Sequence, residues 1–323
     1  MAIVIPFRNE GAGTLNQAKY LGELFRDSAN IPIYWIDDHS SHYPEALAEY
    51  TADRDGFHLL PSTGKPGKKH AIHFALNTLN AEWIFLMDVD SRPNKTILSL
   101  LQTPIDRRCM MLLAPLRPKP SPSLLRNFFD LDFVSLHFVG LKSILIKQPL
   151  LANGAAMLLN RKAYFASLHH RKDWDINSGD DVFAMMAMNK EFGRHAIGIL
   201  PLEKTAVEVS FPDSFSDLWA QRTRWVSKVG RVSGGWFQFV SWLVFAGALA
   251  FFPLAWLSIN RADPVAFAVF VALLIAQIGY LTTACIGLKR KDLIWMILPA
   301  IFLYPFYLVS VVATSIFTKP NWK

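Results

Sequence analysis

The sequence predicts an α/β domain with a mostly parallel sheet, followed by helices that span a membrane. Two observations lead to this fold class. Before about residue 231, short apolar runs alternate with helix-like segments and polar residues follow each run, as in doubly wound α/β folds. Later, the segments 232–260, 264–288 and 293–318 contain no Asp, Glu, Lys, Arg or His, and each exceeds the ~20 apolar residues of a spanning helix.

Charge is distributed unevenly along the 323 residues. The formal net charge is +7, but only six basic and two acidic residues follow Val232, so the part before it is nearly balanced. The net charge therefore gives no reason to expect nucleic-acid binding. Cys109 and Cys285 lie far apart in apolar surroundings, without disulfide or zinc-ligand spacing, which suits a cytosolic compartment. No signal peptide is expected, because the chain opens directly on a strand.

The elements expected before residue 231 follow from hydrophobic periodicity and turn residues. Apolar runs predict strands at 2–7, 31–36, 57–60, 83–87 and 110–115. Helical spacing predicts helices at about 14–26, 44–52, 67–79, 124–146, 180–190 and 217–225. The helix at 124–146 is rich in Phe and Leu, and it fits either an amphipathic helix on a bilayer or a core helix. The Pro-rich stretch 117–122 is expected to have no regular structure.

The strand at 83–87 runs directly into two carboxylates, Asp88 and Asp90. In open α/β sheets, ligands bind beyond the carboxyl ends of the strands. Carboxylates this close together repel each other, and Mg²⁺ or Mn²⁺ takes such oxygen ligands together with substrate phosphates. The alternative interpretation is a solvated acidic turn after a buried strand.

Two glycine-containing stretches also suit a site. Lys68 follows Gly67 at a helix start, where a lysine can meet a diphosphate, although the Gly-x-x-x-x-Gly-Lys-Ser/Thr pattern of a phosphate loop is missing. A solvated basic turn explains the same residues equally well. The small residues around Gly154 suit a backbone that approaches a ligand closely.

Two helices carry further candidates. Asp180 and Asp181 open a helix, where acids either cap the helix or present a carboxylate to a cleft. Gln221, Arg224 and Trp225 share one helix face at i, i+3 and i+4, which by itself indicates little.

The apolar tail predicts a topology. The cluster Lys289-Arg290-Lys291 lies between the second and third apolar segments and is therefore expected in the cytoplasm. The second segment then enters from outside, which places residues 1–231 in the cytoplasm, at the inner membrane if the source is bacterial. Pro299 and Pro305 are expected to kink the third segment or make it re-entrant.

Taken in order, these segments resemble family 2 glycosyltransferases of the GT-A fold, over about residues 1–231. The resemblance rests on Ile5-Pro6-Phe7-Arg8-Asn9-Glu10, Asp37-Asp38-His39-Ser40, Gly67-Lys68-x-x-Ala71, Asp88-Val89-Asp90, Gly179-Asp180-Asp181 and Gln221-Arg222-Thr223-Arg224-Trp225. The last motif is similar to the Gln-x-x-Arg-Trp signature of membrane-embedded members such as cellulose, hyaluronan and ceramide glucosyl synthases. The resemblance implies a nucleotide-sugar-binding catalytic domain at 1–211, an interfacial amphipathic helix at 212–235 and three transmembrane helices at 236–318.

The resemblance also implies a role for each motif. The nucleotide-sugar site would comprise Pro6, Arg8, Glu10, Asp37, Asp38, Lys68 and Asp88. Asp88 and Asp90 would bind a divalent cation, Mg²⁺ or Mn²⁺, and Asn153, Gly154 and Asp180 would lie on the acceptor side. Asp181 would be the general base, while Gln221, Arg224 and Trp225 would hold the acceptor and the leaving diphosphate. His39 stands where many relatives have glycine, so the turn there is expected to differ.

The implied reaction is inverting transfer of a sugar, with a UDP-sugar the expected donor, to a lipid or lipid-linked acceptor at the membrane surface. Such transfer needs a base for the acceptor hydroxyl and positive charge at the departing diphosphate. A processive polysaccharide synthase is the alternative within the family, but three uncharged spans are few to enclose a polar pore unless the protein oligomerises. An inactive sugar-nucleotide-binding membrane subunit and a nucleotidyltransferase are alternatives from other classes. The motifs leave the sugar, the acceptor and the oligomeric state open.

Overall fold

The chain folds into two compact units in a computed structural model that describes residues 1–323 except 26–30, 104, 177–178, 203, 228–234 and 318–323. The first unit contains Met1–Arg117 and Val139–Ser210. The second contains Pro118–Phe138 and the described residues after Ser210.

A seven-stranded sheet forms the centre of the first unit, among its described residues, in the order β3-β2-β1-β4-β8-β6-β9. The strands are β1 (Ala2–Phe7), β2 (Ile33–Asp37), β3 (Phe57–Pro61), β4 (Trp83–Met87), β6 (Met111–Leu113), β8 (Ala156–Asn160) and β9 (Ile197–Ile199). Parallel pairing joins β1 to β2 and β4, β2 to β3, and β6 to β9. Among the described strands of this sheet, β8 alone runs antiparallel to its neighbours, β4 and β6. The prediction of a mostly parallel sheet is confirmed.

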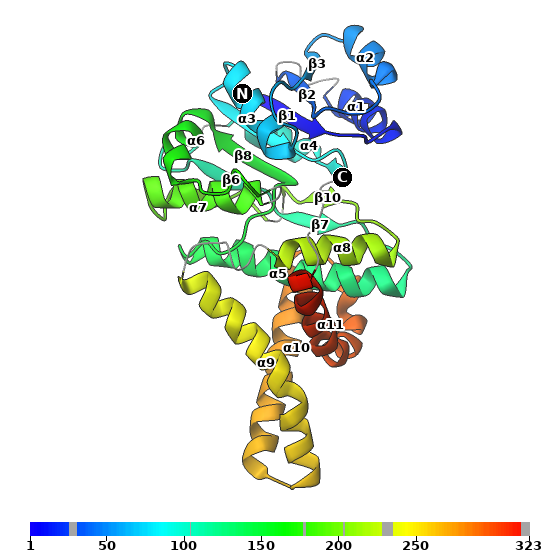
Figure 1. The fold of residues 1–323 in the computed structure, drawn as a ribbon, viewed down its shortest axis with the longest axis vertical. Helices are drawn as coiled ribbons and strands as arrows, with labels where there is room; N and C mark the ends of the chain where they lie inside the picture. The colour runs from blue at the N-terminus through cyan, green and yellow to red at the C-terminus, as the bar shows by residue number, and fades with distance from the viewer. Residues whose placement is uncertain (26–30, 104, 177–178, 203, 228–234, 318–323) are drawn as a thin grey trace. The chain divides into compact units, whose positions relative to one another are not determined.

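The first unit also contains helices, several of which pack against this sheet (Figure 1). They are α1 (Ala12–Leu24), α2 (Glu45–Ala52), α3 (Lys68–Thr78), α4 (Lys95–Leu101), α6 (Arg161–Ser167), the short 3₁₀ helix η1 (Leu168–His170) and α7 (Asp180–Phe192). α3 lies against β1 and β2, whereas α6 lies against β8 and α7 against β9. Every residue of β1 is buried, as expected of a parallel strand covered on both faces.

A smaller sheet overturns one sequence-based expectation. β7 (Leu116–Pro118) joins β10 (Val207–Val209) and β5 (Ser91–Arg92) in the order β5-β10-β7. The stretch 117–122 was expected to have no regular structure, and this is wrong for its first two residues. Proline is tolerated there because an edge strand does not need every backbone N–H for pairing.

The second unit is helical in its described part. It contains α8 (Phe215–Val226), α9 (Gly235–Asn260), α10 (Pro264–Gly287), the 3₁₀ helix η2 (Lys291–Met296), α11 (Ile297–Phe317) and the first part of α5 (Leu124–Leu145). Residues 118–138 group with this unit, although they lie inside the predicted domain 1–211. The physical reason is a set of buried ion pairs: Asp132 of α5 pairs with Arg222 of α8, and Asp130 pairs with Arg290.

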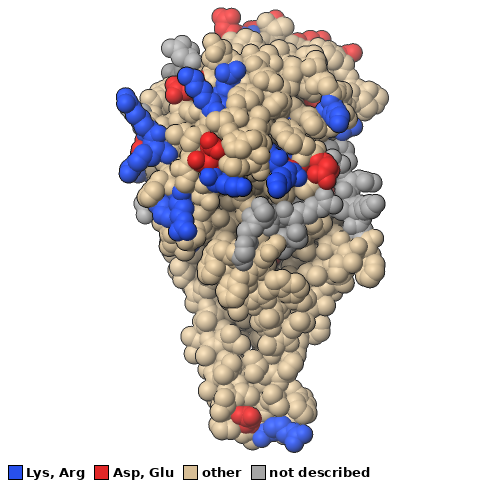
Figure 2. Space-filling model, turned by 60° about the vertical axis from the view of Figure 1, so that its left-hand side comes forward, with Lys and Arg blue, Asp and Glu red and all other residues tan. Residues whose placement is uncertain are grey.

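Within the part of the chain that the structure describes, three helical segments are long and apolar enough to cross a membrane, at Trp236–Asn260, Pro264–Gly287 and Lys291–Phe317. The first two are only 6% buried within the protein, so their apolar side chains need an apolar environment outside it. Figure 2 shows their surface free of charged residues until the α9–α10 connection, which contains Arg261 and Asp263. The third segment includes a continuous α11 that passes through Pro305.

Candidate functional site

The carboxyl ends of β1, β2 and β4 meet at one edge of the large sheet. Parallel register aligns Phe7 with Asp37, and Asp38 N donates to Phe7 O at 2.8 Å. Because β8 runs the other way, it begins beside the end of β4: Met87 pairs with Ala156, and Asp88 N donates to Ala155 O at 3.1 Å. The antiparallel strand therefore places residues 153–155 next to Asp88, which the sequence alone did not indicate.

Asp38 organises the turn that precedes α3. Its side chain is only 2% exposed, and the backbone N–H of Gly67 lies 2.8 and 2.9 Å from its two carboxylate oxygens. Gly67 has φ +133°, a conformation that side chains rarely adopt, so glycine is required at this contact. The neighbouring His39 has φ +56°, which explains why glycine would fit there and why histidine carries a strain cost. Asp38 is thus buried and holds the turn before α3 in place.

Lys68, the first residue of α3, forms an ion pair with Asp88. The Lys68 side chain is 16% exposed and that of Asp88 is 33% exposed, so both are partly buried. Burial acts to lower the pKa of Lys68, but the carboxylates of Asp88, Asp180 and Asp181 outweigh it and the pKa is raised. The lysine is therefore charged at neutral pH, and it links the end of β4 electrostatically to the start of α7.

Asp90 lies two residues beyond Asp88 in the turn between β4 and β5, where Ser91 N donates to Asp88 O at 3.1 Å. Desolvation and, second, the charge of Asp88 raise the pKa of Asp90 to about 7, although the residue is exposed to solvent. The charge of Asp88, two residues away, disfavours ionisation of Asp90. A divalent cation between the two carboxylates would relieve this repulsion.

Asp181 contacts the residues that precede β8. Its Oδ2 accepts a hydrogen bond from Gly154 N at 2.8 Å, and its Oδ1 accepts one from Val182 N at 2.8 Å. A Cβ atom on Gly154 would lie 3.3 Å from the Cβ of Asp181, so the close approach favours glycine. A carboxylate oxygen has two lone pairs, so one that accepts a backbone N–H can also take a hydroxyl proton. The small residues around Gly154 thus position the carboxylate of Asp181 as well as the start of β8.

Asp180 has a different environment from its neighbour. Its Oδ2 is buried without a hydrogen-bond partner in the described structure. It lines a small cavity together with Lys69, Tyr164 and Arg171. Asp180 therefore contributes negative charge from within the first unit, whereas Asp181 contacts the backbone at Gly154.

Three charged residues near this site were not singled out from the sequence. Lys69 is 6% exposed and pairs with Asp173, which is fully buried and also accepts two hydrogen bonds from Arg171, at 2.9 and 2.6 Å. Lys69 Nζ also donates to Ile176 O at 2.9 Å. This cluster fastens the segment between η1 and α7 onto α3. The pair of adjacent lysines at 68 and 69 was visible in the sequence, but only Lys68 was interpreted as functional.

The remaining predicted donor-site residues lie at the same sheet edge. Pro6 is buried in β1, Asp37 ends β2 and accepts a hydrogen bond from Ser40 N at 3.1 Å, and Glu10 is exposed just before α1. Arg8 has its Nε buried without a hydrogen-bond partner in the described structure, so a ligand oxygen could satisfy it. Asn153 Oδ1 accepts a hydrogen bond from Ala155 N at 3.0 Å, which shapes the turn around Gly154.

Gln221, Arg224 and Trp225 belong to the second unit, on α8. This helix begins after Ser214, whose side chain accepts a hydrogen bond from Asp217 N, as an N-cap does. The helical prediction for 217–225 is confirmed, and the spacing places the three residues along one side of α8.

Arg222, between the predicted residues, organises this part of α8. It is 2% exposed, and its Nε donates to Asp132 Oδ2 at 2.7 Å while Nη2 donates to Phe129 O at 2.8 Å. Nη1 donates to Gln221 Oε1 at 2.8 Å, and the guanidinium lies 4.2 Å from the ring centroid of Trp225. Arg222 thus orients two of the three predicted side chains and anchors them to α5. Burial raises the pKa of Asp132 against the opposing effect of Arg222.

Comparisons with known proteins agree with this architecture. The family model described as Glycosyl transferase family 2 matches residues 2–165. Among solved structures, the mannosyltransferase PcManGT from Pyrobaculum calidifontis, in complex with GDP-Man and Mn²⁺, has a TM-score of 0.51 at 16% identity; the match covers 99% of this chain and 81% of that one. This likeness supports the fold over nearly the whole length.

Two other similar structures have lower TM-scores. Glucosyl-3-phosphoglycerate synthase from Mycobacterium tuberculosis, in complex with Mn²⁺, UDP and glucosyl-3-phosphoglycerate, gives a TM-score of 0.45 at 13% identity, covering 72% of this chain and 79% of that one. TarS of S. aureus gives 0.46 at 14% identity, covering 97% of this chain and 54% of that one. A search of curated proteins found no match. Because the family model spans half of the sequence and includes the strand ends described above, the chain belongs to glycosyl transferase family 2 and is a glycosyltransferase of the GT-A fold.

Proposed function

We propose that the protein transfers a sugar from a nucleoside diphosphate sugar, a UDP-sugar in the first instance, to a lipid or lipid-linked acceptor, with inversion at the sugar carbon. The observation that carries this proposal is the convergence of Lys68, Asp88 and Asp181 at the edge of the sheet. Positive charge, a metal-binding type of carboxylate and a candidate base are the three groups that inverting transfer requires.

Asp181 is the proposed general base. The Gly154 and Val182 N–H groups hold its carboxylate in one orientation. An acceptor hydroxyl that approaches either oxygen can pass its proton to the carboxylate as the oxygen attacks the sugar carbon. No covalent intermediate is needed, because the acceptor attacks directly from the face opposite the departing diphosphate.

The donor's diphosphate is proposed to lie near Lys68, which is ionised and remains a point charge as the phosphate leaves. Asp88 and Asp90 suit a hard divalent cation, because both offer oxygen ligands and repel each other. They would hold Mg²⁺ or Mn²⁺, which when bound supplies positive charge at the leaving diphosphate. Arg8 and Glu10 are proposed to line the nucleoside, and Asp38 to position Lys68 through Gly67.

The acceptor is proposed to be a lipid because the catalytic chain is joined to three apolar helical segments. We propose the catalytic domain at 1–211, the helix with Gln221, Arg224 and Trp225 at the membrane surface within 212–235, and three spans within 236–318. The cytoplasmic side is proposed for the catalytic domain, since Lys289 and Lys291 are exposed between the second and third spans. Arg290 contributes less to that argument, because it is buried against Asp130 and Asp292.

A transfer assay tests the proposal. Membranes with the full chain would be incubated with a panel of labelled nucleotide sugars and Mn²⁺, with and without added lipid extract, beside membranes with Asp181→Asn. The expected result is labelled product in the lipid fraction from one or a few donors, and none from the variant. Long water-soluble polymer would favour a processive synthase, and no product from any donor would contradict the proposal.

A further inference from the structure

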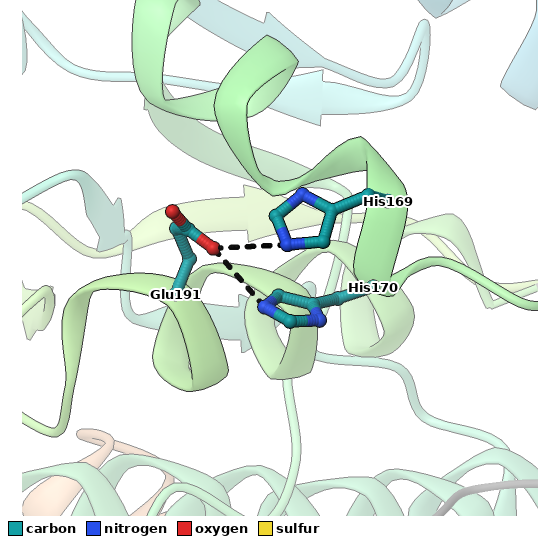
Figure 3. A group of neighbouring side chains, drawn as sticks. All are labelled: His169, His170 and Glu191. Carbon is teal, nitrogen blue, oxygen red and sulfur yellow. Dashed lines mark ion pairs between the residues drawn. The ribbon is translucent and has the colours of Figure 1, made fainter.

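Two histidines and one glutamate form a separate group on the first unit (Figure 3). His169 and His170 end η1, and Glu191 lies in the last turn of α7. A single carboxylate oxygen, Glu191 Oε2, lies 3.3 Å from His169 Nε2 and 3.0 Å from His170 Nε2. One ligating atom from each residue lies within 4.8 Å of the others.

The hydrogen bond on the other side of the His169 ring determines its tautomer. His169 Nδ1 lies 2.9 Å from Ala166 O, and a carbonyl oxygen only accepts, so Nδ1 carries the proton. In a neutral ring, Nε2 then presents a lone pair toward the carboxylate oxygen. Two lone-pair atoms at this separation repel each other unless a cation lies between them or the ring gains a second proton. A backbone carbonyl on Nδ1 is the arrangement that orients metal-binding histidines through Nε2.

Two of the three separations between the ligating atoms fit a tetrahedral metal centre. With metal–nitrogen bonds of about 2.0–2.1 Å, neighbouring ligands of a tetrahedral zinc ion lie about 3.3 Å apart. The separations from Glu191 Oε2, 3.3 Å to His169 Nε2 and 3.0 Å to His170 Nε2, are close to this value. His169 is 61% exposed and Glu191 is 30% exposed, so a metal ion can enter from solvent and water can occupy the remaining position.

We propose that His169, His170 and Glu191 form a binding site for Zn²⁺ or a similar late first-row divalent cation. Imidazole nitrogen favours these metals, whereas Mg²⁺ and Mn²⁺ favour sites made of oxygen. The site is therefore distinct in chemistry from the carboxylate pair at Asp88 and Asp90.

The metal's role is structural. A bound ion joins η1 to the end of α7 and closes the intervening chain into a loop. Such a link lowers the conformational entropy of the unfolded chain and so stabilises the folded state. Within that loop, Asp173 is already fastened to α3 through Lys69. The ion would complete the attachment of α7 at its far end from Asp181. It takes no part in sugar transfer.

Zinc binding by the full-length chain tests this inference. Tag-free protein in detergent would be stripped with a chelator and titrated with Zn²⁺ against a chromophoric indicator, with excess Mg²⁺ present to occupy oxygen-ligand sites. His169→Ala, His170→Ala and Glu191→Gln remove one ligand each. His195→Ala is the matched control, because His195 is exposed, lies shortly after Glu191 and is outside the group.

We expect the wild type and His195→Ala to bind one equivalent of Zn²⁺ with the same affinity. The three ligand variants should bind this equivalent at least tenfold more weakly. Zinc at 100 times its dissociation constant should raise the unfolding midpoint by roughly 5–10 °C in the wild type and in His195→Ala, but not in the three ligand variants. X-ray absorption of the zinc-loaded wild type should show two imidazole ligands. Equal zinc affinity in the wild type and the ligand variants, or no zinc uptake by the wild type, would overturn the inference and assign the group to a protonated His–Glu pair. Melting curves without zinc identify any variant that fails to fold, and the other two variants then decide the question.

Discussion

Replacing Asp181 should distinguish a catalytic base from a helix cap. A base contributes about 10²–10⁴-fold to turnover, or about 2.7–5.5 kcal/mol of activation free energy. Asp181→Asn also has a structural cost, because both oxygens of Asp181 accept backbone N–H groups and an amide offers only one accepting oxygen. One N–H group would lose its partner, which costs about 1–3 kcal/mol. Asp181→Asn alone therefore mixes two effects.

Asp181→Ala with added formate separates these effects. Formate can accept the proton from the acceptor, so turnover of the alanine variant should rise with formate concentration while that of the wild type stays constant. Nucleotide affinity, measured by calorimetry, should change little in either variant. Asp180→Asn is the control, because Asp180 faces a buried cavity and should lose much less activity. A large loss in Asp180→Asn with a mild loss in Asp181→Asn, or no formate effect, would refute the assignment.

Three further outcomes are expected. Lys68→Met should weaken nucleotide binding in calorimetry by roughly 10–100-fold, the contribution of a charged hydrogen bond; unchanged affinity would contradict this role. Asp132→Ala should lower the free energy of unfolding by about 3–5 kcal/mol, because Arg222 remains buried and unpaired. Denaturant titration should show a smaller loss for the double variant Asp132→Leu/Arg222→Met. Alkaline phosphatase fused after α11 should be active in bacteria, and an inactive enzyme with a fluorescent counterpart would contradict the three-span topology.

Much of the first unit was predictable because its strands are buried on both faces. β1 was predicted with the observed bounds, and the predicted strand at 83–87 is β4. Continuous apolar runs followed by polar residues are a strong signal in parallel sheets. β7 and β10 gave no such signal, because each has only three residues, and β7 is an edge strand that contains proline and so looks like a loop in sequence.

The helix at 124–146 shows why local pattern was insufficient elsewhere. Its two interpretations were a bilayer-surface helix and a core helix, and the structure buries Phe129, Phe133 and Phe138 together with Asp130 and Asp132. An acidic residue in a helix looks solvent-facing from the sequence, because its arginine partner lies far along the chain. The aspartates of α5 were therefore overlooked.

The same limit applied to the candidate site. Asp88, Asp90 and Asp181 were identified by their places at element ends, which local patterns reveal. The contact between Asp181 and Gly154 depends on β8 running antiparallel, and strand direction is not encoded in an apolar run. The buried pairing of Lys69 with Asp173 likewise joins residues from distant parts of the sequence.

Nucleotide binding with and without Mn²⁺ tests the central claim that the strand end at Asp88 and Asp90 is a metal-dependent nucleotide-sugar site. Calorimetric titration of the solubilised full chain with UDP requires no knowledge of the acceptor. The wild type should bind UDP tightly only when Mn²⁺ is present, and Asp90→Asn should lose this dependence while it still folds. UDP binding that is equally tight with and without Mn²⁺ in the wild type, or full Mn²⁺ dependence in Asp90→Asn, would contradict the claim.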